Sequence, residues 1–170
     1  GKTIVENLKI EDLWSDVSLS LFMMSYANAL SFQDFISEVS LEGNIEPSIL
    51  DFETISYFAP ELKGNRLKAV VSGSMSGPVD DFTFSNIKIN SLSGGFTGTA
   101  NGRMTGLPDI ERTRIDATLD DFVLTSDGLG DFISEWMMGK GRLDLGKFAK
   151  EMTFSLNANG KGLLNDMNIR

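Results

Sequence analysis

The sequence contains no cysteine and no histidine among its 170 residues. These absences exclude disulfide bonds, a thiolate nucleophile, an imidazole base and the usual zinc and copper sites. Long apolar runs are also missing, because none approaches the roughly 18 residues that a membrane-spanning helix needs. The composition therefore predicts a protein that is not an enzyme and that holds no metal or other cofactor.

Positive charge is scarce as well. The chain has 15 Lys and Arg against 24 Asp and Glu, a formal net charge of −9. Nucleic acids and anionic membrane surfaces attract clustered Lys and Arg, so neither is an expected partner. The chain begins with Gly1 rather than Met, so we interpret the chain as a piece of a larger protein. Membrane contact is then expected only through other parts of that parent protein.

Apolar and polar residues alternate over most of the chain, which is the pattern of antiparallel strands with one dry and one solvated face. The alternation loses its phase between Phe84 and Ile87. We predict a β-bulge near Ser85 and Asn86, because one extra residue returns the following side chains to the dry face. The clearest alternating segments are residues 39–47 (with Val39 and Pro47 expected on the same face), 67–75, 96–104, 115–119 and 152–160.

Helical periodicity is clearest in residues 127–139, where apolar residues recur at the spacing of one helix face. A shorter helix is predicted over residues 51–59, ended by Pro60. A third helix is predicted to begin at Ser31. The residues expected to face inward are Leu129, Phe132, Ile133, Trp136 and Met137 in the first helix and Phe32, Phe35 and Ile36 in the third.

A glycine recurs on the expected dry face at intervals of 30, 29 and 58 residues, as Gly43, Gly73, Gly102 and Gly160. The stretches VSGSMSGPVDDF (71–82) and ANGRMTGLPD (100–109) both contain GxMxG followed by proline and an acidic residue. A fixed period of this length predicts a repeated strand-turn-strand unit of about 29 residues. Each glycine either lets the sheet bend or leaves room for an apolar ligand, and both interpretations are open.

Several stretches resemble catalytic or metal-binding motifs, but each lacks a residue or a spacing that the motif requires. The GxxxxGK of residues 141–147 is followed by Phe148, whereas a phosphate-binding loop requires Ser or Thr at this position. GSMSG places Met75 where a nucleophile elbow has its nucleophile. The acidic pairs at residues 80–81 and 120–121 point to opposite faces of a strand, so neither makes a ready acid and base. The acidic cluster at 120–131 lacks the spacing of an EF-hand calcium site.

Several runs resemble, in order and spacing, a segment of the TamB-like proteins, which belong to the wider AsmA-like group in Gram-negative cell envelopes. The resemblance covers roughly residues 31–170 as a β-repeat segment, whereas residues 1–30 are N-terminal strands that match only in their alternation. We expect a single domain throughout. The runs are ISYFAPELKG (55–64), VSGSMSGPVDDF (71–82), GLPDIERTRID (106–116), LTSDGL (124–129) and DLGKFAKEMTFSLNANGKG (144–162).

The resemblance implies a middle fragment of a large periplasmic protein that is anchored in the inner membrane and forms a long sheet with a hydrophobic groove. It further implies a part in phospholipid transport to the outer membrane or in the assembly of outer-membrane proteins. The implied partners are phospholipid acyl chains and an outer-membrane assembly protein. No catalytic residue is carried over. The groove would be lined by the dry-face residues Val71, Met75, Phe96, Ala100, Met104, Ile115, Leu119, Met152, Phe154 and Leu156.

The predicted fold is mainly β. Antiparallel strands form a repeated strand-turn-strand meander, curved and folded over into a trough or roll, and two or three short helices cover the dry face. The sequence leaves open whether that face is a packed core or a lipid groove. The alternative function is a structural or protein-binding β module whose edge strands pair with client proteins. A hydrolase that uses two carboxylates is the remaining enzymatic alternative.

Overall fold

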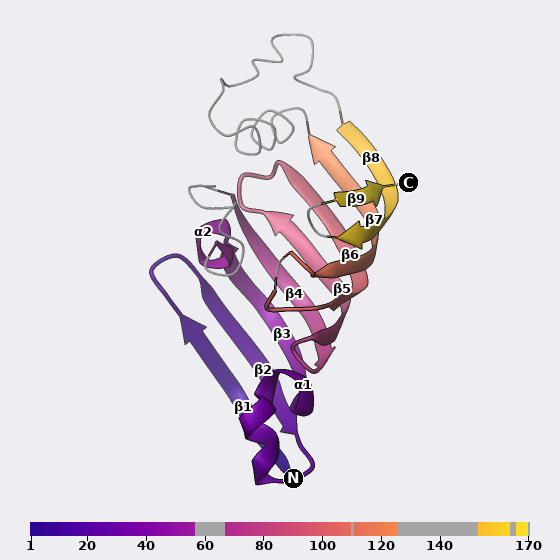
Figure 1. The fold of residues 1–170 in the computed structure, drawn as a ribbon. Helices are drawn as coiled ribbons and strands as arrows, with labels where there is room; N and C mark the ends of the chain where they lie inside the picture. The colour runs from indigo at the N-terminus through magenta and orange to yellow at the C-terminus, as the bar shows by residue number, and fades with distance from the viewer. Residues whose placement is uncertain (57–66, 110, 126–152, 164–165, 170) are drawn as a thin grey trace.

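The computed structural model describes residues 1–56, 67–109, 111–125, 153–163 and 166–169. They form one nine-stranded antiparallel sheet in which each strand lies beside its neighbours in the sequence (Figure 1). The first and last of these strands do not pair, so the sheet is open, and the predicted meander is confirmed. The strands are β1 Lys2–Glu11, β2 Asp16–Ser25, β3 Ser40–Asp51, β4 Lys68–Gly77, β5 Asp81–Ser91, β6 Phe96–Thr105, β7 Arg114–Thr125, β8 Thr153–Leu163 and β9 Asp166–Ile169.

The two GxMxG stretches are strand ends followed by tight turns. β4 ends at Gly77 with φ +115°, and β6 is followed by Gly106 with φ +95°. Glycine suits both positions because it carries no Cβ to oppose a positive φ. The N–H of Gly106 donates to the carbonyl of Asp80 at 2.8 Å, so the two turns are bonded to each other at one end of the sheet.

The helix predicted from Ser31 begins slightly earlier, as η1 (Ala29–Asp34) followed by α1 (Phe35–Glu38). Asn28 caps η1, because its side chain accepts a hydrogen bond from the N–H of Leu30. Phe35 and Ile36 are half-buried, but Phe32 is 43% exposed, so the prediction that it faces inward is wrong. Its ring instead packs edge-on against Tyr26, with ring centroids 4.7 Å apart.

The helix predicted over residues 51–59 is described only as α2 (Phe52–Ile55). It begins where expected because the side chain of Asp51 accepts from the N–H of Glu53 at 2.8 Å. Residues 57–59 and the helix predicted at 127–139 lie outside the described residues. The described helices lie at the two ends of the strands (Figure 1), so they leave the middle of the sheet's faces uncovered.

β-Bulges recur in the alternate strands β3, β5 and β7. β5 carries one extra residue between Phe84 and Ile87, and Asn86 there has φ 51°. The bulge predicted near Ser85 and Asn86 is therefore confirmed. β7 repeats the arrangement with Asp121 at φ 51°, and Asn7 of β1 has φ 54°. Asn and Asp tolerate this left-handed conformation better than other non-glycine residues, which explains their use at these positions.

The bulge in β3 corrects one assignment of faces. An extra residue between Ile45 and Ser48 shifts the register against β4, so Pro47 does not share the face of Val39 and is exposed. Pro47 has no N–H to donate, and the buried hydroxyl of Ser48 supplies contacts at this irregularity. It accepts from the N–H of Ser18 at 2.9 Å and donates to the carbonyl of Glu46 at 2.6 Å.

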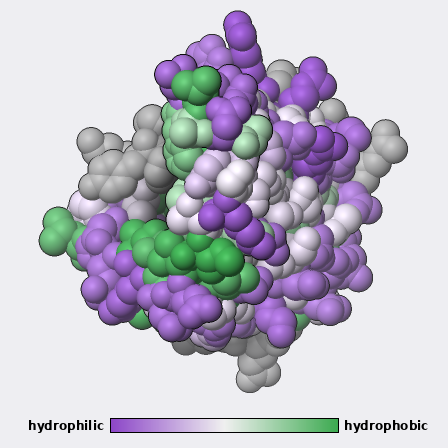
Figure 2. All heavy atoms as spheres, turned by 90° about the horizontal axis from the view of Figure 1, so that it is seen from below, coloured by the Kyte–Doolittle hydropathy of each residue, from purple (hydrophilic) through white to green (hydrophobic). Residues whose placement is uncertain are grey.

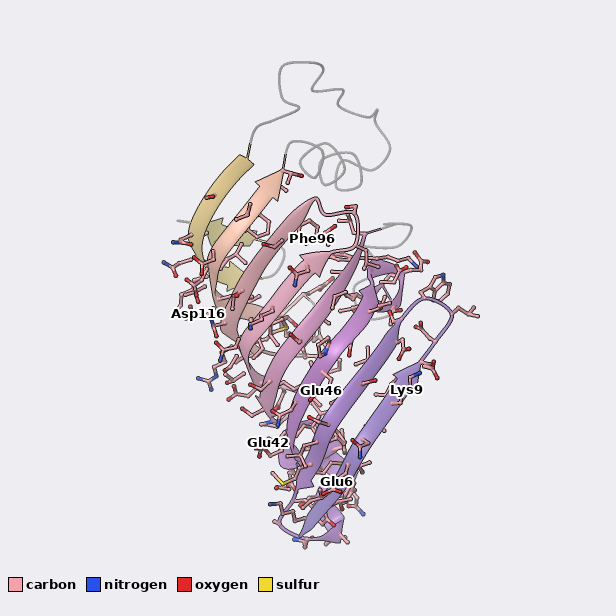
Figure 3. All side chains as sticks on the ribbon, turned by 180° about the vertical axis from the view of Figure 1, so that it is seen from behind. Glu6, Lys9, Glu42, Glu46, Phe96 and Asp116 are labelled. Carbon is pink, nitrogen blue, oxygen red and sulfur yellow. The ribbon has the colours of Figure 1, made fainter. Side chains whose placement is uncertain are left out.

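The two faces of the sheet differ in chemistry. Figure 3 shows one side of the sheet carrying charged residues, among them Glu42, Glu46 and Asp116, all of which are exposed. Side chains of the opposite face are apolar, but few are fully buried. The buried hydrophobic residues of the described part are Leu19, Val39, Leu67, Ala69 and Phe96.

Candidate apolar binding face

Cross-strand pairs place apolar residues in continuous rows on one side of the sheet. Phe82 pairs with Met104, which pairs with Ile115 on the next strand. A parallel row continues through Ile87, Ala100 and Leu119 in the same way. We call this side the apolar face; in β1 to β7 it comprises Val5, Leu8, Ile10, Val17, Leu19, Phe22, Met24, Leu41, Ile45, Leu50, Ala69, Val71, Met75, Phe82, Phe84, Ile87, Ile89, Phe96, Ala100, Met104, Ile115, Ala117, Leu119, Phe122 and Leu124, together with the glycines and Thr3, Ser48 and Ser91.

The predicted lining residues of β4, β6 and β7 all lie on this face, namely Val71, Met75, Phe96, Ala100, Met104, Ile115 and Leu119. Phe96 differs from the others, because it is only 7% exposed and its ring stacks on Phe122 with centroids 6.0 Å apart. It therefore belongs to a packed end of the face. In β8, Phe154 and Leu156 pair with Leu124 and Phe122, whereas Met152 lies outside the described residues.

The prediction missed the contribution of β5, whose residues lie between the predicted lining residues of β4 and β6. Phe84 pairs with Met75 on one side, and Ile89 pairs with Val71. The predicted bulge already returned the side chains of this strand to the dry face, so both residues could have been named with the lining. The prediction also missed the contribution of β2. Phe22, in the run SLSLFMMS, lies on the apolar face and pairs with Gly43 of β3.

The middle of the apolar face is partly exposed to solvent. Val71, Met75, Phe84, Met104 and Leu119 are all half-buried, whereas a face packed against a second layer of structure would have such residues fully buried. Figure 2 looks at the molecule from the end that carries the N-terminus and shows hydrophobic side chains gathered in one area of that end, bordered by hydrophilic ones. The described part of the chain therefore presents an apolar face that its own side chains only partly bury.

Glycines facing the bulges permit close approach of the backbone. A Cβ on Gly73 of β4, which has φ +147°, would lie 2.7 Å from the carbonyl oxygen of Asn86 and 2.9 Å from the Cα of Ile87. Gly98 of β6 stands in the same relation to the bulge of β7, where a Cβ would lie 2.9 Å from the ring of Phe122. These glycines are required because the extra residue of the neighbouring strand occupies the space of a side chain.

The repeat glycines Gly43 and Gly102 are covered by neighbouring side chains. A Cβ on Gly102 would lie 2.6 Å from the ring of Phe84, and one on Gly43 would lie 3.0 Å from Leu19. Gly102 and Gly160 both pair with Ala117, from its two sides. The four glycines therefore do not hold one equivalent position, and the space above Gly43 and Gly102 is filled by the protein itself rather than left for a ligand.

The outer face is held by ion pairs between strands. The guanidinium of Arg103 donates to both carboxylate oxygens of Asp81, which lowers the pKa of Asp81 and raises that of Arg103. On the adjacent strands Lys161 pairs with Asp116 at 2.6 Å. Asp80 instead accepts a hydrogen bond from the hydroxyl of Ser37, so the neighbouring carboxylates Asp80 and Asp81 have different partners and form no acid–base pair.

A polar network joins the strands at the end that carries α2. The backbone N–H groups of Ser15 and Trp14 and the hydroxyl of Thr54 donate to Asp12, which lowers the pKa of Asp12. The carboxylate of Asp51 is 3% exposed and pairs with Lys68 at 2.8 Å. Within the described ranges, no group of three or more acidic residues is arranged to hold a metal ion.

Comparison with known proteins finds no matching protein-family model, no similar curated protein and no similar solved structure. No helix in the described part of the chain is long and apolar enough to cross a membrane. The function is therefore inferred from the chemistry and geometry of the apolar face.

Proposed function

We propose that this chain is a non-enzymatic segment of a large cell-envelope protein and that its apolar face binds the acyl chains of phospholipids. The observation that carries the proposal is an apolar face that is only partly buried and lies opposite a charged one. Apolar area left in water costs about 25 cal/mol per Å² relative to burial. Contiguous exposed apolar surfaces larger than a few hundred Å² mark binding sites in soluble proteins.

The composition of the face favours a hydrocarbon chain as the ligand. From β1 to β7 the register places no charged residue on it, and its members are aliphatic, aromatic or small, with Thr3, Ser48 and Ser91 as its polar exceptions. A ligand that needs hydrogen bonds along its length would find few partners there. With strands spaced about 4.8 Å apart, the face extends roughly 30 Å from β1 to β7, which is long enough for an extended acyl chain.

The cellular setting of the proposal rests on the resemblance to TamB-like proteins. We place the chain in the periplasm, as part of a protein anchored in the inner membrane by a segment outside this sequence. The open sheet would then be one length of a conduit for phospholipid moving to the outer membrane, or a support for the assembly of outer-membrane proteins.

The test combines native mass spectrometry with one pair of matched variants on β6. Met104→Asp puts a carboxylate on the apolar face, whereas Thr99→Asp puts the same group on the outer face of the same strand. We expect acyl-chain lipid to co-purify with the wild type and with Thr99→Asp, and to be lost from Met104→Asp. Circular dichroism checks that both variants remain folded. Equal lipid occupancy in the two variants, or none in the wild type, contradicts the proposal.

A second measurement addresses the parent protein in cells. Met104→Asp in the full-length protein is expected to weaken the outer-membrane barrier, measured as sensitivity to a large hydrophobic antibiotic. Thr99→Asp should retain the barrier at the same level of expression. An intact barrier in the Met104→Asp strain would count against transport along this face.

A further inference from the structure

β1 forms an open edge of the sheet, yet it is built like the interior strands β5 and β7. The five-residue segments ENLKI (6–10), SNIKI (85–89) and DDFVL (120–124) occupy corresponding places. The second residue of each has a left-handed backbone, with φ 54° at Asn7 and 51° at Asn86 and Asp121. The third and fifth residues of each segment lie on the apolar face.

The bulges of β5 and β7 contact their two neighbouring strands in the same way. On the preceding strand a glycine faces it, Gly73 for β5 and Gly98 for β7. On the following strand an asparagine side chain accepts from the bulge N–H, Asn101 for Asn86 at 2.7 Å and Asn157 for Asp121 at 2.8 Å. β1 has β2 on its following side, but its preceding side has no strand within the described residues.

Two large side chains of β1 are exposed on opposite faces of the sheet. Ile4 is 53% exposed on the outer face, and Ile10 is 56% exposed on the apolar face. A ligand lying on the apolar face would cover Ile10 alone. A strand added in the plane of the sheet would flank both.

The left-handed backbone of Asn7 does not by itself prevent pairing at this edge. Bulges and lysines do discourage pairing at sheet edges. The interior strand β5, however, has the same left-handed asparagine at Asn86 and a lysine, Lys88, at the place corresponding to Lys9, and it pairs on both sides. These features are therefore compatible with a neighbouring strand.

We propose that the open edge of β1 binds an extended polypeptide segment in antiparallel register, with a glycine of that segment facing Asn7 and Leu8. Apolar residues of that segment would lie beside Val5 and Ile10. β4 is the template, because its Met75, Gly73 and Val71 hold these positions against β5. The proposal concerns the edge of the sheet and does not depend on lipid binding to the apolar face.

The test uses the full 170-residue chain and a peptide that copies β4, KAVVSGSMSG (68–77). The chain has no cysteine, so each introduced cysteine is unique. Ser74 pairs with Ser85 and Ser72 with Lys88, which correspond to Glu6 and Lys9 of β1. We expect Glu6→Cys to form a disulfide with the Ser74→Cys peptide, and Lys9→Cys with the Ser72→Cys peptide, at least tenfold faster than in the two exchanged combinations.

Gly73→Val in the peptide should reduce crosslinking at least tenfold, because the valine meets the bulge, whereas Val70→Thr should leave it unchanged. Crosslinking without register preference, or without an effect of Gly73→Val, overturns the proposal. So does a Glu6→Cys protein that crosslinks to a second copy faster than to the peptide. Lipid occupancy of the peptide-bound protein, measured in parallel, reports on the apolar face separately.

Discussion

The side-chain oxygen of Asn101 accepts a hydrogen bond from the backbone N–H of Asn86 at a distance of 2.7 Å. Asn86 is the extra residue of the β5 bulge, so its N–H has left the regular ladder of strand hydrogen bonds. Asn157 bonds to Asp121 in the same way at the bulge of β7. An asparagine on the following strand thus holds each of these bulges in register.

Replacing this asparagine should weaken the fold. Asn101→Ala removes the acceptor and should lower the free energy of unfolding by about 1 kcal/mol, the usual net value of one hydrogen bond. Asn90→Ala is the control, because Asn90 is exposed on β5 and makes no side-chain hydrogen bond among the described residues. Urea denaturation measures both changes. Equal stability of the two variants would show that solvent replaces the acceptor without cost.

The glycine that faces the β5 bulge should tolerate no side chain. Gly73→Ala combines an unfavourable φ with a contact to the backbone of Asn86, and should cost roughly 2–4 kcal/mol. Gly94→Ala tests the effect of a positive φ alone, since a Cβ there meets nothing within 4 Å, and should cost about 1 kcal/mol. A smaller loss at Gly73 than at Gly94, measured by thermal unfolding, would contradict the close approach described here.

The openness of the apolar face can be tested by overpacking. Ala100 is half-buried in the middle of the face, whereas Ala69 is 2% exposed near its end. Ala100→Phe should change the free energy of unfolding by less than about 1 kcal/mol, because the ring has free space. Ala69→Phe should cost about 1–3 kcal/mol or more, as overpacking of a filled core does. Similar losses in both variants, measured by chemical denaturation, would identify the whole face as a packed core.

The ion pair between Asp81 and Arg103 should make stability depend on acid pH. The bonds from Arg103 hold the folded-state pKa of Asp81 below its ordinary value, so their contribution is present above the unfolded-state pKa. It is lost as the pH falls through the lowered folded-state pKa. Unfolding curves between pH 6 and pH 2 should therefore fall less steeply for Asp81→Asn than for the wild type.

Glu42→Gln provides the control for that titration, since Glu42 is exposed on the same outer face and has no ion pair among the described residues. Its curve should lie closer to that of the wild type. A curve for Asp81→Asn that runs parallel to the wild type across the whole range would show that the pair contributes nothing to folding.

Much of the fold could be predicted from the sequence, because period-two alternation survives wherever one face of a strand is apolar and the other polar. The bulge at Asn86 was predictable because the apolar–polar alternation changes phase between Phe84 and Ile87. The left-handed residue Asn7 and the bulge at Asp121 were harder to see, because the segments around them are short and the alternation on either side is less regular. In physical terms, the signal was an Asn or Asp followed by an apolar residue, since these residues tolerate the left-handed backbone.

The repeat glycines show where sequence reasoning stopped. Their regular spacing suggested one equivalent position, but spacing along the chain does not record which neighbour each glycine faces across the sheet. Gly73 faces the bulge of β5, whereas Gly102 lies under the ring of Phe84. Lining residues on β4 and β6, and on β7 before its bulge, were predictable because these segments alternate without interruption. The residues of β5 were not named as lining residues, because they lie on both sides of a bulge and therefore in two phases.

Each described strand pairs only with the strands that come before and after it in the sequence. The stability of the sheet is then approximately a sum of the interactions between neighbouring strands, as in repeat proteins. No pairing between strands distant in the sequence fixes how many strands the sheet must contain. One hairpin with its bulge can be duplicated or deleted without rewiring the others. The width of such a sheet therefore increases with each hairpin that is added to it.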